Sequence, residues 1–336
     1  MSTARDRRGL LLMLIAIALL LIMVVVSLMI GARPVAPGVV IEALLRPDMS
    51  LADHSVVLTQ RIPRTVIGIL AGASLALAGT LMQGLTRNPL ADPGLLGVNA
   101  GASVAVLAAI TLWGITSPSG FVWFAFAGAA IASIVVAVIG TRGPDGSSPA
   151  KLALTGAAVT AGLTAVTTLV LTTSITAFDV FRYWQVGGLT TRGLDTVAVV
   201  VLPIAIGAVI AFGSARGLDL IALGDETATG LGHSVARTRT LGIVATVLLC
   251  GSATAIAGPI VFLGLLVPHA LRAIVGGDYR WLLAIGAPAG AVVLLAADVL
   301  GRVIAPPGEV QAGLVVAFVG APVLISLVLR PGRVTL

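Results

Sequence analysis

Charge is scarce in this chain. Asp, Glu, Lys and Arg make up 10% of its 336 residues, and hydrophobic residues make up 58%. A water-soluble domain of ordinary composition carries about 25% charged residues, so this composition excludes that class and predicts a chain lying mostly in a membrane. With about 20 residues in each spanning helix, the length leaves room for roughly ten spans, short loops and no soluble domain.

Cysteine, histidine and lysine are also rare. Cys250 is the only cysteine, which excludes an internal disulfide. With three histidines and no ligand spacing around His269, we expect no metal site and no cofactor. Lys151 is the only lysine and lies between Ala150 and Leu152, whereas a phosphate-binding Walker loop needs Gly-Lys-Ser/Thr. The chain therefore cannot hydrolyse ATP by itself.

The basic residues are scattered along the chain. Lys and Arg number 20 against 14 Asp and Glu, and the net charge is +6. They lie at loop ends and form no basic patch interleaved with aromatics, so we expect no nucleic-acid partner. Charge-free stretches locate the spans, since a charge at the bilayer centre costs at least about 2.5 kcal/mol. They predict ten spans, over 10–30, 64–84, 94–113, 121–141, 152–173, 195–213, 240–257, 259–275, 282–300 and 311–329.

The first apolar run follows Arg5, Arg7 and Arg8 and covers residues 10–30. It is longer than the ~7–15 apolar residues of a cleaved signal peptide, so it is predicted to stay as the first span. Glycines spaced four apart, Gly68 with Gly72 and Gly286 with Gly290, predict close approach of neighbouring helices and no chemistry.

A polar break separates two long apolar runs at residues 85–100. Asn88-Pro89 and Asp92-Pro93-Gly94 are strong turn signals, because each proline disfavours helix in the residue before it. Within a membrane, bent backbone of this kind survives only at the interface or where it lines a cavity enclosed by protein.

This break is one of several blocks that resemble a single family in the same order. The blocks are Arg61–Arg64, Gly79–Gln83, Asn88–Gly97, Tyr183–Gly188, Leu223–Gly232, Gly258–Arg272, Ala297–Arg302 and Gly320–Pro322. Together they resemble the membrane subunits of ABC importers for iron chelates (siderophores, haem) and vitamin B12. Glu309-Val310-Gln311 departs from the pattern, with glutamine where many relatives carry proline, which leaves the outer end of the last span open.

The resemblance implies an all-α permease with type II ABC importer architecture, a single transmembrane domain over residues 1–336 of a bacterial cytoplasmic membrane. Its partners would be membrane lipid, a second permease chain (identical or homologous), two ABC ATPase subunits and an extracytoplasmic substrate-binding protein. The chain would catalyse no reaction. It would move an iron–siderophore complex, haem or cobalamin inward by ATP-driven alternating access.

The resemblance also implies site residues. The longest cytoplasmic loop, 214–239, would dock the ATPase through a short helix within Leu220–Gly232, with Asp225 and Glu226 near its positive N-terminal end. The coupling candidates are Leu223, Gly224, Asp225, Glu226, Ala228, Leu231 and Gly232. From spacing alone, an ordinary solvated connector remains the alternative.

A cytoplasmic gate would include Asn88 and Leu90, with a purely structural turn as the alternative. Ser148-Pro149-Ala150 departs from the family's pattern, so a gate contribution from the fifth span stays open. At the outer face, the resemblance makes Arg61, Arg64 and Arg302 acceptors for carboxylates of the binding protein. Snorkelling at the lipid interface is the alternative for these arginines.

Two other classes compete with this interpretation. A secondary carrier normally needs a carboxylate within the membrane, and Asp298, near the outer end of its span, is the only one that approaches a span interior. A membrane enzyme would need a His, Asp or Glu cluster at one membrane face, and the sequence offers none. Genes for an ATPase and a binding protein beside this one would favour the importer over both rivals.

The distribution of basic residues predicts that both termini are cytoplasmic. Ten spans put the termini on one side, and thirteen of the 20 Lys and Arg residues lie on that side, which the positive-inside rule makes the cytoplasm. A reporter active only inside the cell, fused to Leu336, should therefore give signal. Signal from a fused reporter that works only outside would contradict the ten-span topology.

Overall fold

Helices account for all the regular structure in the described part of the chain. The structure is a computed structural model, and it describes residues 2–31, 34–141, 149–190, 193–306 and 308–329. Within those ranges no strand occurs. The all-α fold predicted from composition is confirmed.

A helix coincides with each of the ten predicted spans. These helices are α1 (Ser2–Met29), α4 (Ile62–Thr86), α5 (Val98–Trp113), α6 (Pro118–Thr141), α7 (Pro149–Thr173), α9 (Leu194–Ala222), α11 (Val235–Ala257), α12 (Leu263–Val275), α13 (Tyr279–Ile304) and α14 (Ala312–Val328). Among the described residues, seven helices are long and apolar enough to cross a membrane, while Val98–Trp113, Leu263–Val275 and Ala312–Ser326 are shorter. A shorter helix covers only part of a bilayer about 30 Å thick.

Helix α9 differs from its predicted bounds. It runs to Ala222, although the predicted span ends at 213, because Leu218 and Ile221 continue its buried face beyond Arg216. The predicted helix within Leu220–Gly232 is correspondingly shorter. It is α10 (Asp225–Gly230), which begins after Gly224 at a φ of 104°.

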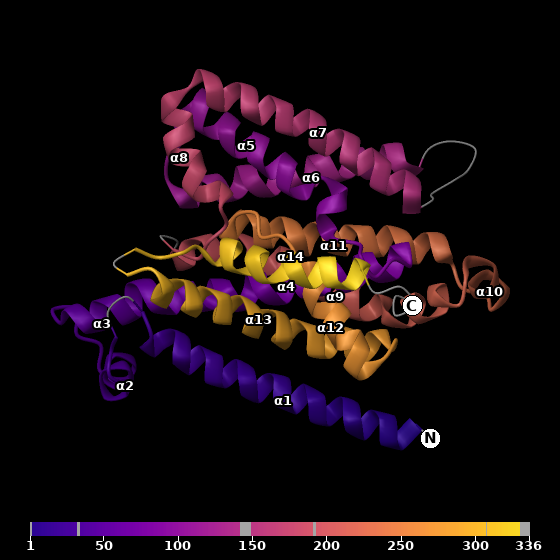
Figure 1. The fold of residues 1–336 in the computed structure, drawn as a ribbon, viewed down its shortest axis with the longest axis horizontal. Coiled ribbons are helices and arrows are strands. Elements are labelled where there is room, and N and C mark those ends of the chain that lie inside the picture. The colour runs from indigo at the N-terminus through magenta and orange to yellow at the C-terminus, as the bar shows by residue number, and fades with distance from the viewer. Residues whose placement is uncertain (1, 32–33, 142–148, 191–192, 307, 330–336) are drawn as a thin grey trace.

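Short elements join the long helices. Between α1 and α4 come α2 (Pro37–Leu45), α3 (Ala52–Val56) and the π-helical turn η1 (Val57–Arg61), which runs directly into α4. The 3-10 turn η2 (Pro93–Leu96) precedes α5, and α8 (Ile175–Gln185) follows α7. In Figure 1, α2, α3 and α8 lie at one end of the bundle and α10 lies at the other.

Helix α4 is the centre of the packing. It contacts α9, α11, α12 and α13, and 78% of its spanning window is buried. Gly72 faces Gly290 of α13, and Gly79 faces Gly264 of α12, so closely that a Cβ at either position of α4 would collide with the facing backbone. The close approach predicted at Gly72 and Gly290 is therefore present.

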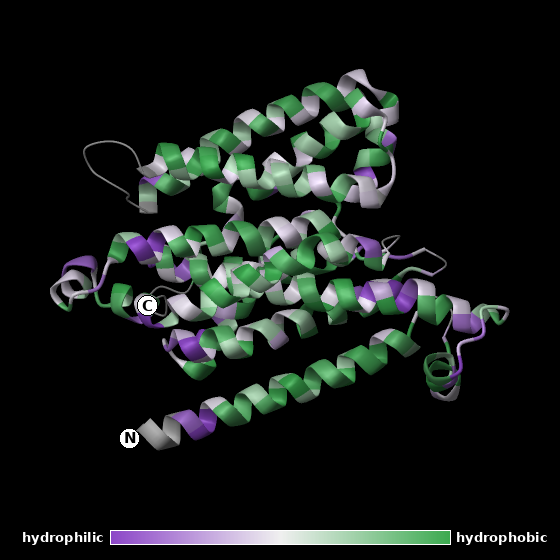
Figure 2. Cartoon of the chain, turned by 180° about the vertical axis from the view of Figure 1, so that it is seen from behind, coloured by the Kyte–Doolittle hydropathy of each residue, from purple (hydrophilic) through white to green (hydrophobic). Residues whose placement is uncertain are grey.

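The outer helices leave apolar surface uncovered. Only 11% of the spanning windows of α1 and α7 is buried, and 22% of that of α9. Figure 2 shows hydrophobic residues along the long helices and hydrophilic residues gathered mainly near their ends. This distribution is the one expected of a bundle surrounded by lipid, in which the polar ends reach water.

Candidate functional site

A buried ion network holds together the end of the bundle near α3. Asp298 of α13 is fully buried and accepts hydrogen bonds from Arg64 of α4, with Nε–Oδ distances of 2.9 and 3.0 Å and an Nη2–Oδ1 distance of 2.8 Å. Arg302, one turn further along α13, donates to the same carboxylate through its Nε, at 3.0 Å, and its Nη2. One carboxylate thus serves two guanidinium groups, and such charge-assisted bonds are the strong class.

The network extends to two further elements. Arg64 Nη1 donates to Glu309 Oε2 at 2.7 Å, which ties in the segment between α13 and α14. Arg302 Nη1 donates to the carbonyls of Ser27, at 2.7 Å, and Ile30, at 2.9 Å, at the end of α1. Every one of these groups would be costly to bury alone, so the network fixes the positions of α1, α4, α13 and this segment relative to one another.

The three arginines predicted to dock a binding protein all lie at this end, but their side chains are buried. Arg61, Arg64 and Arg302 are 5%, 9% and 2% exposed. Arg61 Nη1 donates to the Leu28 carbonyl at 2.6 Å. The snorkelling alternative does not describe them either, because their charged groups contact protein atoms. Their docking role stays a prediction, and docking through them would require these internal contacts to rearrange.

The polar break after α4 is built from two side-chain turns. Asn88 Oδ1 accepts from the Leu90 backbone N–H at 2.9 Å, and Asp92 Oδ1 accepts from the Gly94 N–H at 2.7 Å. Both are turns in which a short polar side chain caps its own backbone. Asn88 is exposed and Leu90 is half-buried. The turn therefore has a structural role, and its part in a gate stays a prediction.

Helix α10 is joined to this break by ion pairs. The Asp225 carboxylate lies 2.8 Å from Arg239 Nη2 of α11 and 3.5 Å from Arg87 Nη2, the residue just after α4. Asp225 is the first residue of α10, where a carboxylate also suits the helix N-terminus. A displacement of α10 would therefore act directly on the ends of α4 and α11.

The remaining coupling candidates form a mixed surface on and beside α10. Leu223 and Leu231 are exposed apolar residues, at 61% and 63%, and Glu226 is exposed beside them, whereas Ala228 is buried. Gly224 and Gly232 flank α10 with positive φ. Two exposed leucines beside an acidic residue are compatible with a protein contact, and the coupling role of these residues stays a prediction.

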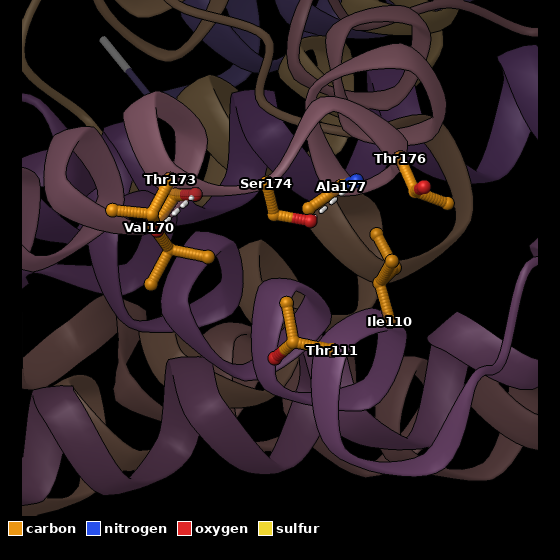
Figure 3. A pocket seen from close by; sticks show the side chains of 7 residues that line it. All are labelled: Ile110, Thr111, Val170, Thr173, Ser174, Thr176 and Ala177. Carbon is orange, nitrogen blue, oxygen red and sulfur yellow. Dashed lines mark hydrogen bonds between the residues drawn. The ribbon is translucent and has the colours of Figure 1, made fainter.

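A cavity opens between α5, α7 and α8 (Figure 3). Its volume is about 450 Å³, and it is lined by Ile110, Thr111, Val170, Thr173, Ser174, Thr176 and Ala177. Ser174 caps α8 by accepting from the Ala177 N–H at 3.2 Å. The lining is hydroxyl groups and aliphatic carbons without a charged side chain, so it suits weak polar contacts more than ion binding.

The described residues hold no group of three or more His, Cys, Asp or Glu side chains arranged to bind a metal ion. The sequence analysis singled out Asp298, Arg64 and Arg302 separately but did not predict that they pair. It also missed the pairing of Arg64 with Glu309 and that of Asp225 with Arg87 and Arg239. The spacing of Asp298 and Arg302, four apart on one helix, was an available signal for one of these pairs.

The chain matches the FecCD transport family model over residues 19–330. It is 48% identical over 325 residues to the ferric enterobactin transport system permease protein FepD of Escherichia coli, covering 97% of this chain and 95% of FepD. It is 38% identical over 270 residues to the cobalamin import system permease protein BtuC of Halobacterium salinarum, covering 80% of this chain and 72% of that protein.

Two solved structures share the fold. One is a metal-chelate type ABC transporter in an inward-facing conformation, with a TM-score of 0.82, 26% identity, and coverage of 94% of this chain and 98% of that one. The other, PsaBC from Streptococcus pneumoniae in complex with Fab, has a TM-score of 0.60 at 16% identity, covers 89% of this chain and 98% of that one, and supports the fold alone.

Breaking the buried network should destabilise the protein strongly. Asp298→Asn leaves two buried guanidinium groups without their counter-charge, and loss of one partner of a buried pair costs about 3–5 kcal/mol. Thermal unfolding can be followed with a thiol-reactive dye, because the single cysteine, Cys250, is buried. The midpoint should fall by many degrees.

The matched control is Asp179→Asn, which removes a carboxylate 3.4 Å from Arg182 in a pair whose side chains are about half exposed. Exposed pairs contribute roughly 1 kcal/mol or less, so its midpoint should stay near that of the unchanged protein. Equal midpoints for the two variants would contradict the role assigned to Asp298.

Proposed function

The chain belongs to the FecCD transport family, and from that membership we propose that it carries an iron–siderophore complex across a bacterial cytoplasmic membrane. It is a permease subunit of an ABC importer, with no catalytic step of its own. The observation that carries the substrate class is the 48% identity to a ferric enterobactin permease over nearly the whole chain. Haem and cobalamin are the alternatives, and the 38% identity to a cobalamin permease keeps the second open.

Two ATPase subunits would supply the energy, since the chain has no Walker loop of its own. We propose that each ATPase receives α10, with Leu223, Leu231 and Glu226 as its contact surface. The support is the exposure of these side chains beside Asp225, whose ion pairs reach Arg87 and Arg239. Closure of the ATPases on ATP would move α10, and with it the Asn88–Leu90 turn that we propose as the cytoplasmic gate.

The membrane arrangement follows from the same proposal. The 1–336 chain would form one transmembrane domain and pair with a second permease chain, identical or homologous, so that the pathway runs between them. The end that carries α10 would face the cytoplasm together with both termini, and the end that carries α3 would face outward. The exposed apolar surfaces of α1, α7 and α9 leave room for both lipid and a second chain.

The rival secondary carrier is disfavoured by the contacts of Asp298. A proton- or ion-coupled carrier needs a carboxylate that exchanges its partner during transport. The Asp298 carboxylate is bound by both Arg64 and Arg302 and is fully buried. Held by both arginines, the Asp298 carboxylate ties α4 to α13 and has no place for a transported ion.

Uptake in cells tests the substrate class. A strain that lacks the gene should lose accumulation of a labelled ferric catecholate siderophore and keep that of labelled cobalamin and haem. The gene supplied on a plasmid should restore the lost uptake. Loss of cobalamin or haem uptake, with siderophore uptake intact, would overturn the proposed substrate while leaving the importer class standing.

Reversal of the acidic start of α10 tests ATPase coupling. Asp225→Arg with Glu226→Arg should leave the protein inserted but lower ATPase co-purification and uptake at least several-fold, because the ties to Arg87 and Arg239 become repulsive and the acidic part of the proposed contact surface is reversed in charge. Asp179→Arg, far from α10 on α8, is the control and should change neither. Normal co-purification and uptake in the double variant would mean that this loop is only a connector.

The docking prediction for the outer arginines needs a variant that spares the buried network. Arg61→Gln keeps Arg64 and Arg302 with Asp298, and should slow association with the binding protein and weaken its dependence on salt, as loss of a steering charge does. Arg46→Gln, an exposed arginine between α2 and α3, is the control. An unchanged rate and salt dependence for Arg61→Gln, with a normal thermal midpoint, would make Arg61 a structural residue only.

A further inference from the structure

An apolar groove runs between α6 and α11 on the outside of the bundle. Its volume is about 430 Å³, and it is lined by Phe126, Ala130, Ser133, Ile134, Ala137 and Val138 of α6 and by Thr240, Ile243, Val244, Val247 and Leu248 of α11. Ile134, Val138 and Val244 are substantially exposed. The groove therefore presents aliphatic side chains where a soluble protein would present polar ones.

The length of the groove matches one leaflet of a bilayer. At a rise of 1.5 Å per residue, residues 240–248 cover about 12 Å of α11 and residues 126–138 about 18 Å of α6. One leaflet of a hydrocarbon core about 30 Å thick is about 15 Å deep. The groove begins near the end of the bundle that carries α10, where α6 ends and α11 begins (Figure 1).

An exposed arginine lies on the line of the groove at that end. Arg237 is in the first turn of α11, and the 3.6-residue period puts it on the same face as Val244 and Leu248. It lies about 4–5 Å along the helix axis before Thr240, the first groove residue of α11. The groove thus combines an apolar channel of one-leaflet length with a cation at its mouth, which is the charge pattern complementary to a single anionic phospholipid.

We propose that this groove holds an acyl chain of an anionic phospholipid in the leaflet next to α10, with the lipid phosphate bound by Arg237. Three of its lining residues on α6, Ala130, Ser133 and Ala137, are small, and a slender hydrocarbon chain can lie against them more closely than a bulky group can. A bound lipid would fill space between α6 and α11, and α11 also carries Arg239, the partner of Asp225.

The experiment uses the purified full chain in detergent with phosphatidylglycerol that carries a photoreactive group on one acyl chain. Light should label peptides containing residues 126–138 and 240–248. A phosphatidylcholine probe with the same chain should label them about fivefold less, because one arginine near an anionic headgroup changes binding by roughly that factor. Arg237→Gln should abolish the difference between the two probes.

Two further variants keep the result interpretable. Arg216→Gln removes an exposed arginine of α9 that does not line the groove, and it should keep the preference for phosphatidylglycerol. Val244→Trp should fill the groove and reduce labelling of α6 without changing the thermal midpoint reported at Cys250. Equal labelling by the two probes, an Arg237→Gln variant with an unchanged preference, or cross-linking of the groove to another protein chain would each overturn the proposal.

Discussion

The carboxylate of Asp298 is the contact on which one end of this bundle depends. It is fully buried and shared by Arg64 of α4 and Arg302 of α13, and Arg302 reaches the end of α1. Buried charges of this kind are tolerated only when every member is paired. The arrangement of α1, α4 and α13 is therefore specified by charge as well as by the close contact of Gly72 with Gly290.

At the opposite end of the bundle, one carboxylate is again shared by two arginines, but in a more exposed position. Asp225 is paired with Arg87 and Arg239, but these side chains are partly solvated, so the pairs are individually weaker and easier to rearrange. Helix α4 connects the two ends, with Arg64 near its start and Arg87 just after its last residue. A firmly held end near α3 and a more loosely tied α10 would suit the proposed permease, in which energy enters at one face and the binding protein is received at the other.

Much of the fold could be predicted from the sequence, because charge-free runs report directly on lipid burial. The exception at α9 is instructive, since Arg216 and Asp219 ended the apolar run while the helix continued. There the Asp219 carboxylate accepts from the Tyr279 backbone N–H at 3.0 Å, a contact with the start of α13. The positions of Arg61, Arg64 and Arg302 near one end were predictable, but their burial was not. Ion pairs between residues far apart in the chain depend on packing that no local spacing encodes.

Central to the proposed function is that this permease moves its substrate with energy from ATP hydrolysed by partner subunits. The most direct measurement is uptake of a labelled ferric siderophore into vesicles that contain the chain together with its permease partner, ATPases and binding protein, with proton and sodium gradients collapsed. We expect uptake that requires ATP and every partner. Uptake by this chain alone, driven by a proton or sodium gradient without ATP, would contradict it.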